Sequence, residues 1–527
     1  MSTHFPPITT ADLDWQWVDG VDIPVSKQFG DVYFSKANGL LETRHVFLNG
    51  NDLSERLSAL EAHDYFCVGE TGFGTGLNIL ALWQLWQQVR PDNHSHLHAI
   101  SVEKLPLSKA DLIRALKAWP ELAPLAEQLI AQYPLPIAGC HRLNFPNERF
   151  SLDLWLGDAH DVFPVIPKPH QVHAWFLDGF APSCNPDMWE DKVLSNIVRL
   201  SDVGTTFASF SVAGVLKRGL KQHGIQISRP RGFGHKREML KGIWPSLEIA
   251  EKKTAKQRHI GIVGAGIAGL STAWAFANRG HQVTIFEETA PLGGASGNPL
   301  ALLNPKLCPI EQANEHLMTL AWQHALRHYA NFKAYRPIEV NQIALKQPDE
   351  LLKLAQEYPQ GVLSAAPQNP LSTLATLTLH HAATVSPHIL RDEILAHPQI
   401  KLQLAQVSHI SSDPRPMLYA DTECLGEFDH VIVCSALKSA RFIENYPTLK
   451  PIRGQVSWLK NSQTPLALDQ AYSYGGYCMQ LDAQQLILGA SFYPQREDSD
   501  VLIEDHVHNL NLLKSVAPTY AEGLIDV

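Results

Sequence analysis

The sequence twice places a glycine-rich turn between an apolar strand and a helix. In the first copy, strand and turn span residues 65–76, and we expect a helix over 77–89. In the second, strand and turn span 260–269, and the expected helix runs to about residue 279. This order is typical of nucleotide-binding α/β domains. Because the glycine spacing differs between the copies, we interpret them as two different domains in tandem and not as an internal repeat.

The segment between the two copies suggests where the domains meet. A chain of 527 residues has room for about three to four domain-sized units. Residues 251–258 are charged and directly precede the second strand, which is typical of a linker. We therefore predict one α/β domain over 1–250 and a second over 259–527. In the second domain we expect helices over 311–335 and 387–396 and short strands over 402–410, 430–434 and 485–490. This mixture resembles a nucleotide-binding domain with an inserted α+β domain.

The first turn has the pattern E-x-G-x-G-x-G. Glycines at alternate positions let the backbone turn tightly and let a ligand approach without a Cβ in the way. A phosphate cradle would need a following Lys-Ser/Thr pair or the spacing G-x-G-x-x-G, and this turn has neither. The pattern favours S-adenosylmethionine, with Glu70, Gly72, Gly74 and Gly76 as its binding residues.

Two later strands of the first domain end in acids. Glu103 follows the strand 99–102 and is a candidate to accept both ribose hydroxyls of the cofactor. Asp158 follows the strand 154–157 and is a candidate to reach the adenine amine. The alternative for each is a solvated acid beside an ordinary turn. The order of the glycines and acids, all at strand ends, favours a Rossmann-like methyltransferase domain.

Asp178 is the candidate catalytic residue. The apolar strand 174–177 delivers it into a turn constrained by prolines. Methylation of an amine needs a neutral nitrogen lone pair, and a carboxylate that accepts the amine's hydrogens orients the nitrogen and takes the proton. The alternative role is a turn or helix-capping acid. Phe180 and Trp189 are candidates for stacking on a base, with the hydrophobic core as the alternative place for such large rings.

A strongly basic stretch lies at the end of the first domain. From Lys217 to Arg258, twelve basic residues face three acids, so this stretch carries +9 while the whole chain carries −10. Such asymmetry is the footprint of a nucleic-acid face on an acidic protein, or else of a solvated helix face and linker. The candidate RNA-binding residues are Lys217, Arg218, Arg229, Arg231, Lys236 and Arg237.

The second turn has the spacing G-x-G-x-x-G and opens a helix. Its glycines, Gly264, Gly266 and Gly269, suit a pyrophosphate on the helix N-terminus. Glu287 ends the next strand, 21 residues after Gly266, and is the candidate ribose ligand. NAD and FAD both fit this pattern. A second small-residue turn that contains Gly294, Ser296 and Gly297 favours FAD, and residues 451–455 and 488–491 look like elements of amino-acid oxidase domains.

Composition excludes several other classes of protein. A net charge of −10 excludes a uniformly basic nucleic-acid coat. No apolar run approaches the roughly 18–20 residues that a membrane span needs. The seven cysteines are scattered without a C-x-x-C pair, as in a cytoplasmic protein with reduced thiols. We expect a cytoplasmic monomer with no metal ion and no membrane partner.

Taken together, these motifs resemble the MnmC family of bifunctional tRNA-modifying proteins. The motifs that match its pattern are the turn 70–76, the segments 178–182 and 185–189, the segment 232–239 and the flavin glycines. The resemblance covers nearly the whole chain and implies two steps on a wobble uridine of tRNA. The FAD half removes the carboxymethyl group from 5-carboxymethylaminomethyl-(2-thio)uridine, and the methyltransferase half methylates the resulting amine. It also implies that 217–258 faces tRNA.

The chain departs from the family pattern at its C-terminal end. The flavin domain of the family continues beyond the point where this sequence stops, with a final strand and helix at the flavin. We therefore expect an FAD half that is truncated at its C-terminus. Two alternatives stay open at this point: a methyltransferase with an inactive oxidase half, and a fusion of an amine oxidase with an N-methyltransferase that acts on small molecules without RNA.

Overall fold

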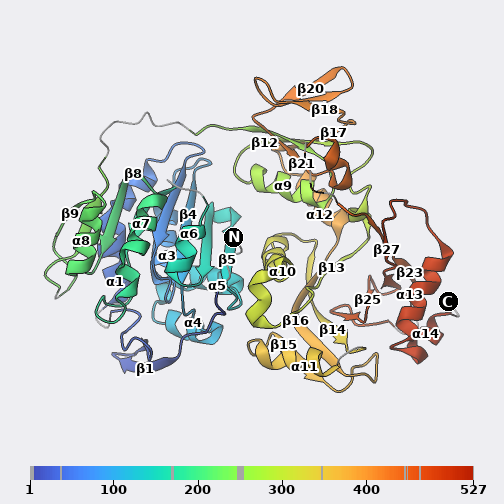
Figure 1. Ribbon diagram of the computed structural model, residues 1–527, viewed down its shortest axis with the longest axis horizontal. Helices are drawn as coiled ribbons and strands as arrows, with labels where there is room; N and C mark the ends of the chain where they lie inside the picture. The colour runs from blue at the N-terminus through green and yellow to red at the C-terminus, as the bar shows by residue number, and fades with distance from the viewer. Residues whose placement is uncertain are drawn as a thin grey trace. The chain divides into compact units, whose positions relative to one another are not determined.

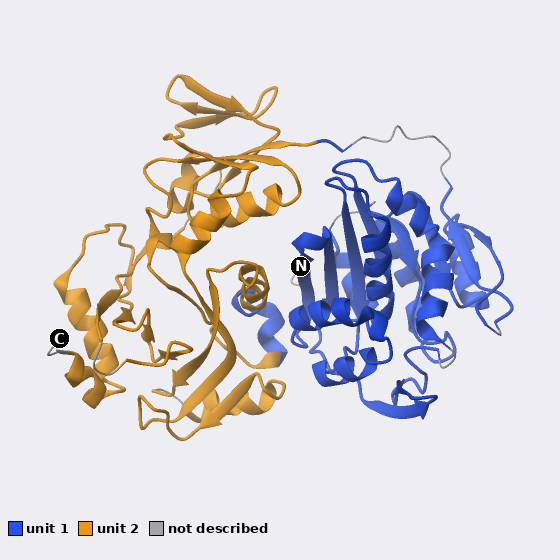
Figure 2. Ribbon diagram, turned by 180° about the vertical axis from the view of Figure 1, so that it is seen from behind, with its two compact units in different colours: residues 1–256, 311–320 blue, residues 257–310, 321–527 orange. Residues whose placement is uncertain are grey.

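The computed structural model divides the chain into two compact units. Unit 1 comprises Met1–Lys256 with Glu311–Leu320, and unit 2 comprises Gln257–Ile310 with Ala321–Val527 (Figure 2). The structure describes all residues except 1–4, 36–37, 168–170, 235, 246–254, 346–347, 444, 446, 448, 462–464 and 526–527. Half of the expected linker 251–258 therefore lies outside the described residues.

Unit 1 is built on one eight-stranded sheet in the order β5-β6-β4-β3-β7-β8-β10-β9 (Figure 1). The five strands β6, β4, β3, β7 and β8 pair in parallel, and β5, β10 and β9 add antiparallel edges. The strands are β3 (Tyr65–Glu70), β4 (His96–Glu103), β5 (Gly139–Phe145), β6 (Phe150–Leu156), β7 (Val172–Phe176), β8 (Ser201–Ser209), β9 (Gln226–Ser228) and β10 (Leu240–Ile243), and a hairpin of β1 (Leu13–Val18) and β2 (Val21–Ser26) precedes them.

Helices cover both faces of this sheet because its strands are apolar on both sides. Along β3, Phe66 and Val68 belong to one hydrophobic core while Cys67 belongs to the other. In β7, Phe176 and Trp175 divide between the cores in the same way, as the two-residue period of a strand requires. The helices are α1 (Gly39–Thr43), α2 (Leu53–Ser58), α3 (Leu77–Val89), α4 (Lys109–Leu116), α5 (Ala123–Gln132), α6 (Ala159–Val165), α7 (Asp191–Leu200) and α8 (Gly214–Gln222).

Unit 2 contains a parallel sheet and a larger mixed sheet. The parallel sheet has the order β17-β12-β11-β21, and α9 packs on it beside α12. Its elements are β11 (His259–Val263), α9 (Ile267–Ala277), β12 (Gln282–Glu287), α12 (Pro387–Leu395), β17 (Ile400–Leu404) and β21 (His430–Val433). The expected α/β class of both halves is thus confirmed.

The mixed sheet has the order β13-β16-β14-β24-β25-β26-β23, with β15 paired to β16. It corresponds to the inserted α+β part that the sequence predicts. Its elements and their neighbours are β13 (Ala301–Leu303), α10 (Leu317–Tyr329), β14 (Tyr335–Ile343), α11 (Pro348–Glu357), β15 (Leu363–Ala366), β16 (Thr376–Val385), β22 (Ile452–Arg453), β23 (Ser457–Lys460), β24 (Gln470–Ser473), β25 (Tyr477–Gln480), β26 (Gln485–Gly489), β27 (Tyr493–Pro494), α13 (Ile503–Lys514) and α14 (Pro518–Ile525).

Two elements expected in the second half of the chain are wrong in extent. The helix expected over 311–335 is a short 3-10 segment followed by α10, which ends at Tyr329. The Asn331 side chain donates to the carbonyl oxygens of Arg327 and His328 at this end, and the chain then enters β14. The strand expected over 402–410 is two strands. β17 ends at Leu404, and the chain then leaves the parallel sheet for β18 (His409–Ser411), which pairs with β19 (Met417–Ala420), itself paired with β20 (Glu423–Glu427).

Candidate functional site

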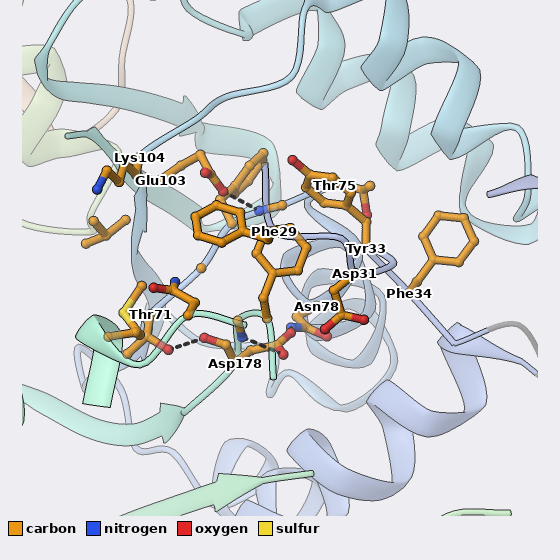
Figure 3. A pocket seen from close by; sticks show the side chains of 18 of the residues that line it. Phe29, Asp31, Tyr33, Phe34, Thr71, Thr75, Asn78, Glu103, Lys104 and Asp178 are labelled. Atoms are coloured by element: carbon orange, nitrogen blue, oxygen red, sulfur yellow. Dashed lines mark hydrogen bonds between the residues drawn. The ribbon is translucent and has the colours of Figure 1, made fainter. Parts of the chain in front are cut away.

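A cavity of about 400 Å³ opens in unit 1 where β3, β4 and β7 end (Figure 3). The glycine-rich turn forms part of its wall through Gly72 and Gly74, whereas Gly76 at the end of the turn does not line it. Gly74 and Gly76 have φ of 52° and 72°, a left-handed backbone that favours glycine. A Cβ on Gly72 would lie 3.4 Å from the carbonyl oxygen of Asp178. The turn therefore brings bare backbone against the cavity, as close approach by a ligand requires.

Glu70 lies beneath this turn and not in the cavity wall. Its side chain is fully buried, and its Oε2 accepts a 2.5 Å hydrogen bond from the Ser101 hydroxyl on the neighbouring strand β4. Burial raises the pKa of Glu70 well above the usual value. Glu70 therefore lies behind the turn, bonded to β4, and does not line the cavity, which differs from the direct binding role that the sequence pattern suggests.

Glu103 lines the cavity and is held by the backbone. Its Oε2 accepts a hydrogen bond from Gly74 N at 2.8 Å, and its Oε1 accepts one from Leu105 N at 2.8 Å. Burial raises the pKa of Glu103 to about 7 even though these bonds favour the charged form. The carboxylate is thus fixed at the end of β4, where the sequence predicts a ribose ligand.

Asp158 also lines the cavity, but it has a cation beside it. It caps α6 by accepting a hydrogen bond from His160 N, and its Oδ2 lies 2.8 Å from Lys104 Nζ. Burial alone would raise its pKa, but the hydrogen bonds from Lys104 and His160 outweigh burial and lower it to about 2. Asp158 is therefore ionised at neutral pH, and Lys104 offsets its charge.

Asp178 sits across the cavity from Glu103, just after β7. Its Oδ2 accepts a hydrogen bond from Asn78 Nδ2 at 2.6 Å, and its Oδ1 accepts one from Gly179 N at 2.8 Å. The Thr71 hydroxyl donates to its backbone carbonyl at 2.5 Å (Figure 3). Burial raises the pKa of Asp178 to about 6. A carboxylate with that pKa exchanges a proton near neutral pH, which suits a group that must accept one.

Acids outnumber cations in the wall of this cavity. Its acids are Asp31, Glu42, Glu103, Asp158, Asp178 and Asp187, whereas its lysines are Lys104 and Lys236. The two lysines are engaged with Asp158 and Glu42, the latter at 2.6 Å. Among the described residues, Glu103 and Asp178 have no lysine or arginine within ion-pair distance. A cationic ligand such as a sulfonium therefore fits this wall better than an anion.

The sequence analysis missed several lining residues. Phe29, Asp31 and Tyr33 come from the segment after β2, far from the motifs in the chain, whereas Asn78 lies two residues after the glycine-rich turn and Lys104 follows Glu103. Asp31 Oδ2 accepts a hydrogen bond from Ala181 N at 3.0 Å and so holds the turn that carries Asp178. A weak signal existed for Asn78 and Lys104 only, since both adjoin residues that the patterns single out.

The structure places one of the two aromatic candidates in the cavity wall and the other in the hydrophobic core. Phe180 lines the cavity, stacked on Phe29 with ring centroids 4.8 Å apart and edge-on to Tyr33 at 5.1 Å. Trp189 is 1% exposed and belongs to the core beneath α7, so its proposed role in stacking on a base is wrong. Its ring packs there because the 3-10 turn at 187–189 directs it inward.

The basic candidates occupy α8 and the segment that leads to β10. Arg218, Arg229, Arg231, Lys236 and Arg237 are exposed, and Lys217 is half-buried. Arg229 pairs with Glu238, and Lys236 lines the cavity with its ammonium 4.5 Å from the centre of the Phe210 ring. The basic stretch therefore adjoins the cavity through Lys236. His235, Lys252 and Lys253 lie outside the described residues.

In unit 2, the second glycine-rich turn has the shape of a cofactor cradle. Gly264 has φ of 107°, and a Cβ there would lie 2.6 Å from the carbonyl oxygen of Cys434. A Cβ on Gly269 would lie 1.9 Å from the Gly264 oxygen, so only glycine lets α9 start so close to β11. No such obstruction from backbone faces Gly266. These are the distinct glycine roles that a dinucleotide-binding turn requires.

The remaining FAD candidates surround this turn. Glu287 ends β12, and its Oε2 accepts a hydrogen bond from Ala265 N at 2.8 Å. The Ser296 hydroxyl accepts one from Ile267 N at 3.1 Å, at the start of α9. Gly294 is exposed and Gly297 donates its N–H to the Gly294 carbonyl, so the small-residue turn lies against the helix N-terminus. The residues present fit a dinucleotide such as FAD.

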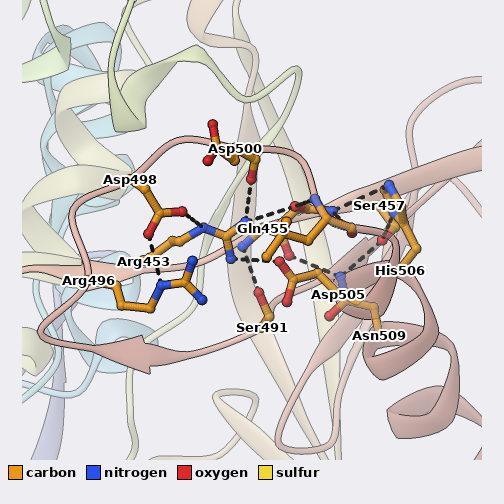
Figure 4. A network of polar contacts seen from close by, with 11 residues as sticks. Arg453, Gln455, Ser457, Ser491, Arg496, Asp498, Asp500, Asp505, His506 and Asn509 are labelled. Carbon is orange, nitrogen blue, oxygen red and sulfur yellow. Dashed lines mark hydrogen bonds and ion pairs between the residues drawn. The ribbon is translucent and has the colours of Figure 1, made fainter.

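A buried polar network lies elsewhere in unit 2 (Figure 4). The guanidinium of Arg453 contacts Asp505 at 2.6 Å and Asp498 at 2.9 Å and donates to the Asp500 carbonyl. Gln455 joins β22 to the start of α13 through hydrogen bonds with the backbone of Leu502. The network ties together the segments 451–455 and 488–491 that look like oxidase elements, together with α13.

Neither membrane spans nor metal clusters occur among the residues that the structure describes. No helix there is long and apolar enough to cross a bilayer. No group of three or more His, Cys, Asp or Glu side chains in the same part of the chain is arranged to hold a metal ion.

Comparisons with known proteins match each half to a family. Residues 120–245 match a family described as S-adenosyl-L-methionine-dependent methyltransferase, and residues 259–527 match FAD dependent oxidoreductase. The tRNA 5-methylaminomethyl-2-thiouridine biosynthesis bifunctional protein MnmC of Acinetobacter baylyi is 66% identical over 98% of this chain and 85% of its own length. The protein of that name from Psychrobacter cryohalolentis is 37% identical over 98% of this chain and 84% of its own.

Solved structures resemble only part of the chain. The crystal structure of MNMC2 from Aquifex aeolicus has a TM-score of 0.37 at 22% identity and covers 45% of this chain and 73% of that one. Glycine oxidase from Geobacillus kaustophilus has a TM-score of 0.40 at 19% identity and covers 50% of this chain and 79% of that one. These likenesses are too weak to carry an argument.

Proposed function

Since this chain belongs to the MnmC family of bifunctional tRNA 5-methylaminomethyl-2-thiouridine biosynthesis proteins, we propose that it modifies the wobble uridine of tRNA in two steps. The FAD-dependent half converts the 5-carboxymethylaminomethyl group to an aminomethyl group. The methyltransferase half then converts this group to methylaminomethyl with S-adenosylmethionine as methyl donor. The proposal includes action as a cytoplasmic monomer that needs no metal ion.

The observation that carries the methyltransferase step is Asp178 in an acidic cavity beside the glycine-rich turn. A primary amine is protonated at neutral pH and cannot attack until it loses a proton. We propose that the Asp178 carboxylate accepts the amine's hydrogens, orients the nitrogen and takes up this proton before the lone pair attacks; the N–C bond then forms as the bond between the methyl carbon and sulfur breaks. Glu103, the backbone of the turn and the excess of acids over lysines in the cavity wall are the features proposed to hold the cationic methyl donor.

In unit 2, the turn 264–269, Glu287 and Ser296 are proposed to hold FAD. Bound FAD supplies the oxidising power for cleavage of the C–N bond, which protein side chains lack. The substrate of this step is an N-substituted glycine, and hydrolysis after its oxidation leaves the aminomethyl group. The chain's own part is to bind and orient the two reactants.

The exposed arginines of the basic stretch are proposed to contact tRNA phosphates. Arg218, Arg231 and Arg237 project from the segment that reaches the cavity through Lys236. Phosphate contacts of this kind weaken as salt rises, whereas binding of a small neutral substrate does not. Salt-dependent affinity for tRNA therefore separates the proposal from a small-molecule fusion enzyme.

Nucleoside mass spectrometry tests both steps. One tRNA sample carries the carboxymethylaminomethyl group and another the aminomethyl group, and each is incubated with the protein, FAD and S-adenosylmethionine. We expect methylaminomethyl-uridine from both. Product from the second sample alone would overturn the oxidase half of the proposal and favour a methyltransferase with an inactive partner domain. Product from neither would overturn the tRNA assignment.

A further inference from the structure

We infer that Asn78, itself held by Thr43, is the positioning residue that aims the Asp178 carboxylate at the reacting amine and keeps it ready to accept a proton. This inference deepens the proposed function and rests on it. The three side chains come from three parts of unit 1: Thr43 ends α1, Asn78 is the second residue of α3, and Asp178 follows β7.

Two consecutive hydrogen bonds connect these side chains. The Thr43 hydroxyl donates to Asn78 Oδ1 at 2.7 Å, and Asn78 Nδ2 donates to Asp178 Oδ2 at 2.6 Å. Thr43 is 4% exposed and Asn78 6% exposed, so water does not compete freely for either bond. An amide has an accepting end and a donating end, and the Thr43 hydroxyl occupies the accepting one. Asn78 therefore presents its N–H group, and not its oxygen, to the carboxylate.

The position of Asn78 in the chain couples this contact to the glycine-rich turn. Asn78 follows Gly76, the last glycine of the turn, by two residues, and it lines the same cavity as Gly72 and Gly74. Asp178 is in turn held against the far side of the turn by Thr71, whose hydroxyl donates to its carbonyl oxygen. The turn proposed to hold the methyl donor thus also fixes the carboxylate proposed to receive the proton (Figure 3).

The charges around Asp178 explain why a neutral donor matters here. Glu42 from α1 and Glu70 from β3 are the acids that act on it, Lys236 is the cation, and Asp31 holds its turn through Ala181 N. A second cation at the position of Asn78 would lower the affinity for a cationic substrate. An amide N–H favours the carboxylate without adding charge, and it leaves the proton affinity high enough for the carboxylate to act as a base.

The test compares pH profiles of methyl transfer to aminomethyl-tRNA in four proteins: wild type, Asn78→Ala, Thr43→Val and Thr71→Val. In wild type, kcat rises with pH as Asp178 ionises. In Asn78→Ala we expect the midpoint of the kcat–pH profile to rise by about one pH unit, because the hydrogen bond that favours the ionised form of Asp178 is lost. Thr43→Val keeps the amide but frees its orientation, so we expect a smaller shift in the same direction.

Thr71→Val is the matched control, since it also removes a hydroxyl that holds Asp178 but acts on the backbone carbonyl. A purely structural role for Asn78 predicts lower kcat with the same midpoint in all variants, and that result would overturn the inference. A raised midpoint in Asn78→Ala and Thr43→Val, with none in Thr71→Val, supports it. Thermal unfolding checks that each variant is folded. If Asn78→Ala does not fold, the midpoint measured for Thr43→Val tests the inference in its place.

A second measurement separates failure of the inference from failure of the proposed function. The protein is labelled with ¹³C at aspartate carboxyls and titrated by NMR, with the Asp178 signal identified by its absence in Asp178→Asn. This titration needs no methyl transfer. If the wild-type protein does not methylate the tRNA, the proposed function fails, but the titration midpoint of the Asp178 carboxyl still tests the inference. A higher midpoint in Asn78→Ala than in wild type supports the inference, and an unchanged midpoint overturns it.

Discussion

Asp178 in unit 1 and Asp505 in unit 2 are both withdrawn from solvent, and the protein holds them in opposite ways. Asp178 receives neutral donors, Asn78 and a backbone N–H, and its pKa is raised to about 6 by burial. Asp505 is fully buried against the guanidinium of Arg453. Burial alone would raise the pKa of Asp505, but the hydrogen bonds from Arg453 and Tyr493 outweigh burial and lower it.

The difference separates a carboxylate that awaits a ligand from one that joins segments of the chain. The Asp505–Arg453 pair satisfies both charges inside the protein and connects β22 to α13. Asp178 faces a cavity, and the groups that donate to its carboxylate, Asn78 Nδ2 and Gly179 N, carry no charge. Buried charges without a partner are costly, so such an arrangement persists where function requires it.

The largest effect that this comparison predicts is on methyl transfer. Asp178→Asn keeps the shape of the side chain but removes its ability to accept a proton. We expect kcat for methylation of aminomethyl-tRNA to fall by about 10²- to 10⁴-fold, the usual contribution of a general base. Mass spectrometry of the nucleosides under single-turnover conditions measures the rate.

The control for this variant is Asp161→Asn, an exposed acid on α6 that does not line the cavity. It removes the same charge from unit 1 and is expected to change the rate less than threefold. An equal loss of activity in both variants would mean that net charge, and not the position of Asp178, accounts for the effect.

A smaller effect, on stability, is expected from Asp505→Asn. The substitution leaves the buried Arg453 with less compensation, and removing one partner of a buried pair destabilises more than removing both. We expect the thermal unfolding midpoint of unit 2 to fall by several degrees. The double variant Arg453→Met/Asp505→Asn should recover part of this loss. No recovery would show that Arg453 and Asp505 do not act as a pair.

Much of the fold and of the cavity could be predicted because local patterns determine them. Strand, glycine turn and helix follow one another directly over residues 65–89 and again over 259–277, and the acids at 103, 158 and 178 lie at or just after the ends of apolar strands. The parallel order of those strands then brings their carboxyl ends to one edge of the sheet.

Contacts between segments that lie far apart in the chain could not be predicted from the sequence. Asp31 reaches the turn after β7 across 150 residues, and Thr43 reaches Asn78 across 35. Neither belongs to a motif, since a hydroxyl or carboxylate in a loop has no characteristic spacing. The same limit explains Trp189, because an aromatic next to a cavity segment can face the cavity or the core, and only the packed structure places it.

The smallest effect is the pH dependence of stability, and it has opposite signs in the two regions. The raised pKa of Asp178 means that the folded state binds a proton between about pH 4 and 6 that the unfolded state has lost, so this group's contribution to stability falls as pH rises through that window. Asp505 has a lowered pKa, so its contribution is present above about pH 4 and is lost as pH falls further.

Denaturant unfolding at pH 4.5 and pH 7.5 checks both signs. Relative to wild type, Asp178→Asn should gain stability on going to pH 7.5, by about 1–3 kcal/mol, because the amide has no charge to bury. Asp505→Asn should instead be less stable than wild type by the same amount at both pH values, and its stability should approach that of wild type only at lower pH. If Asp178→Asn gains nothing at pH 7.5, the Asp178 carboxylate already has a compensating partner in the free protein, and the contrast between the two carboxylates no longer explains their roles.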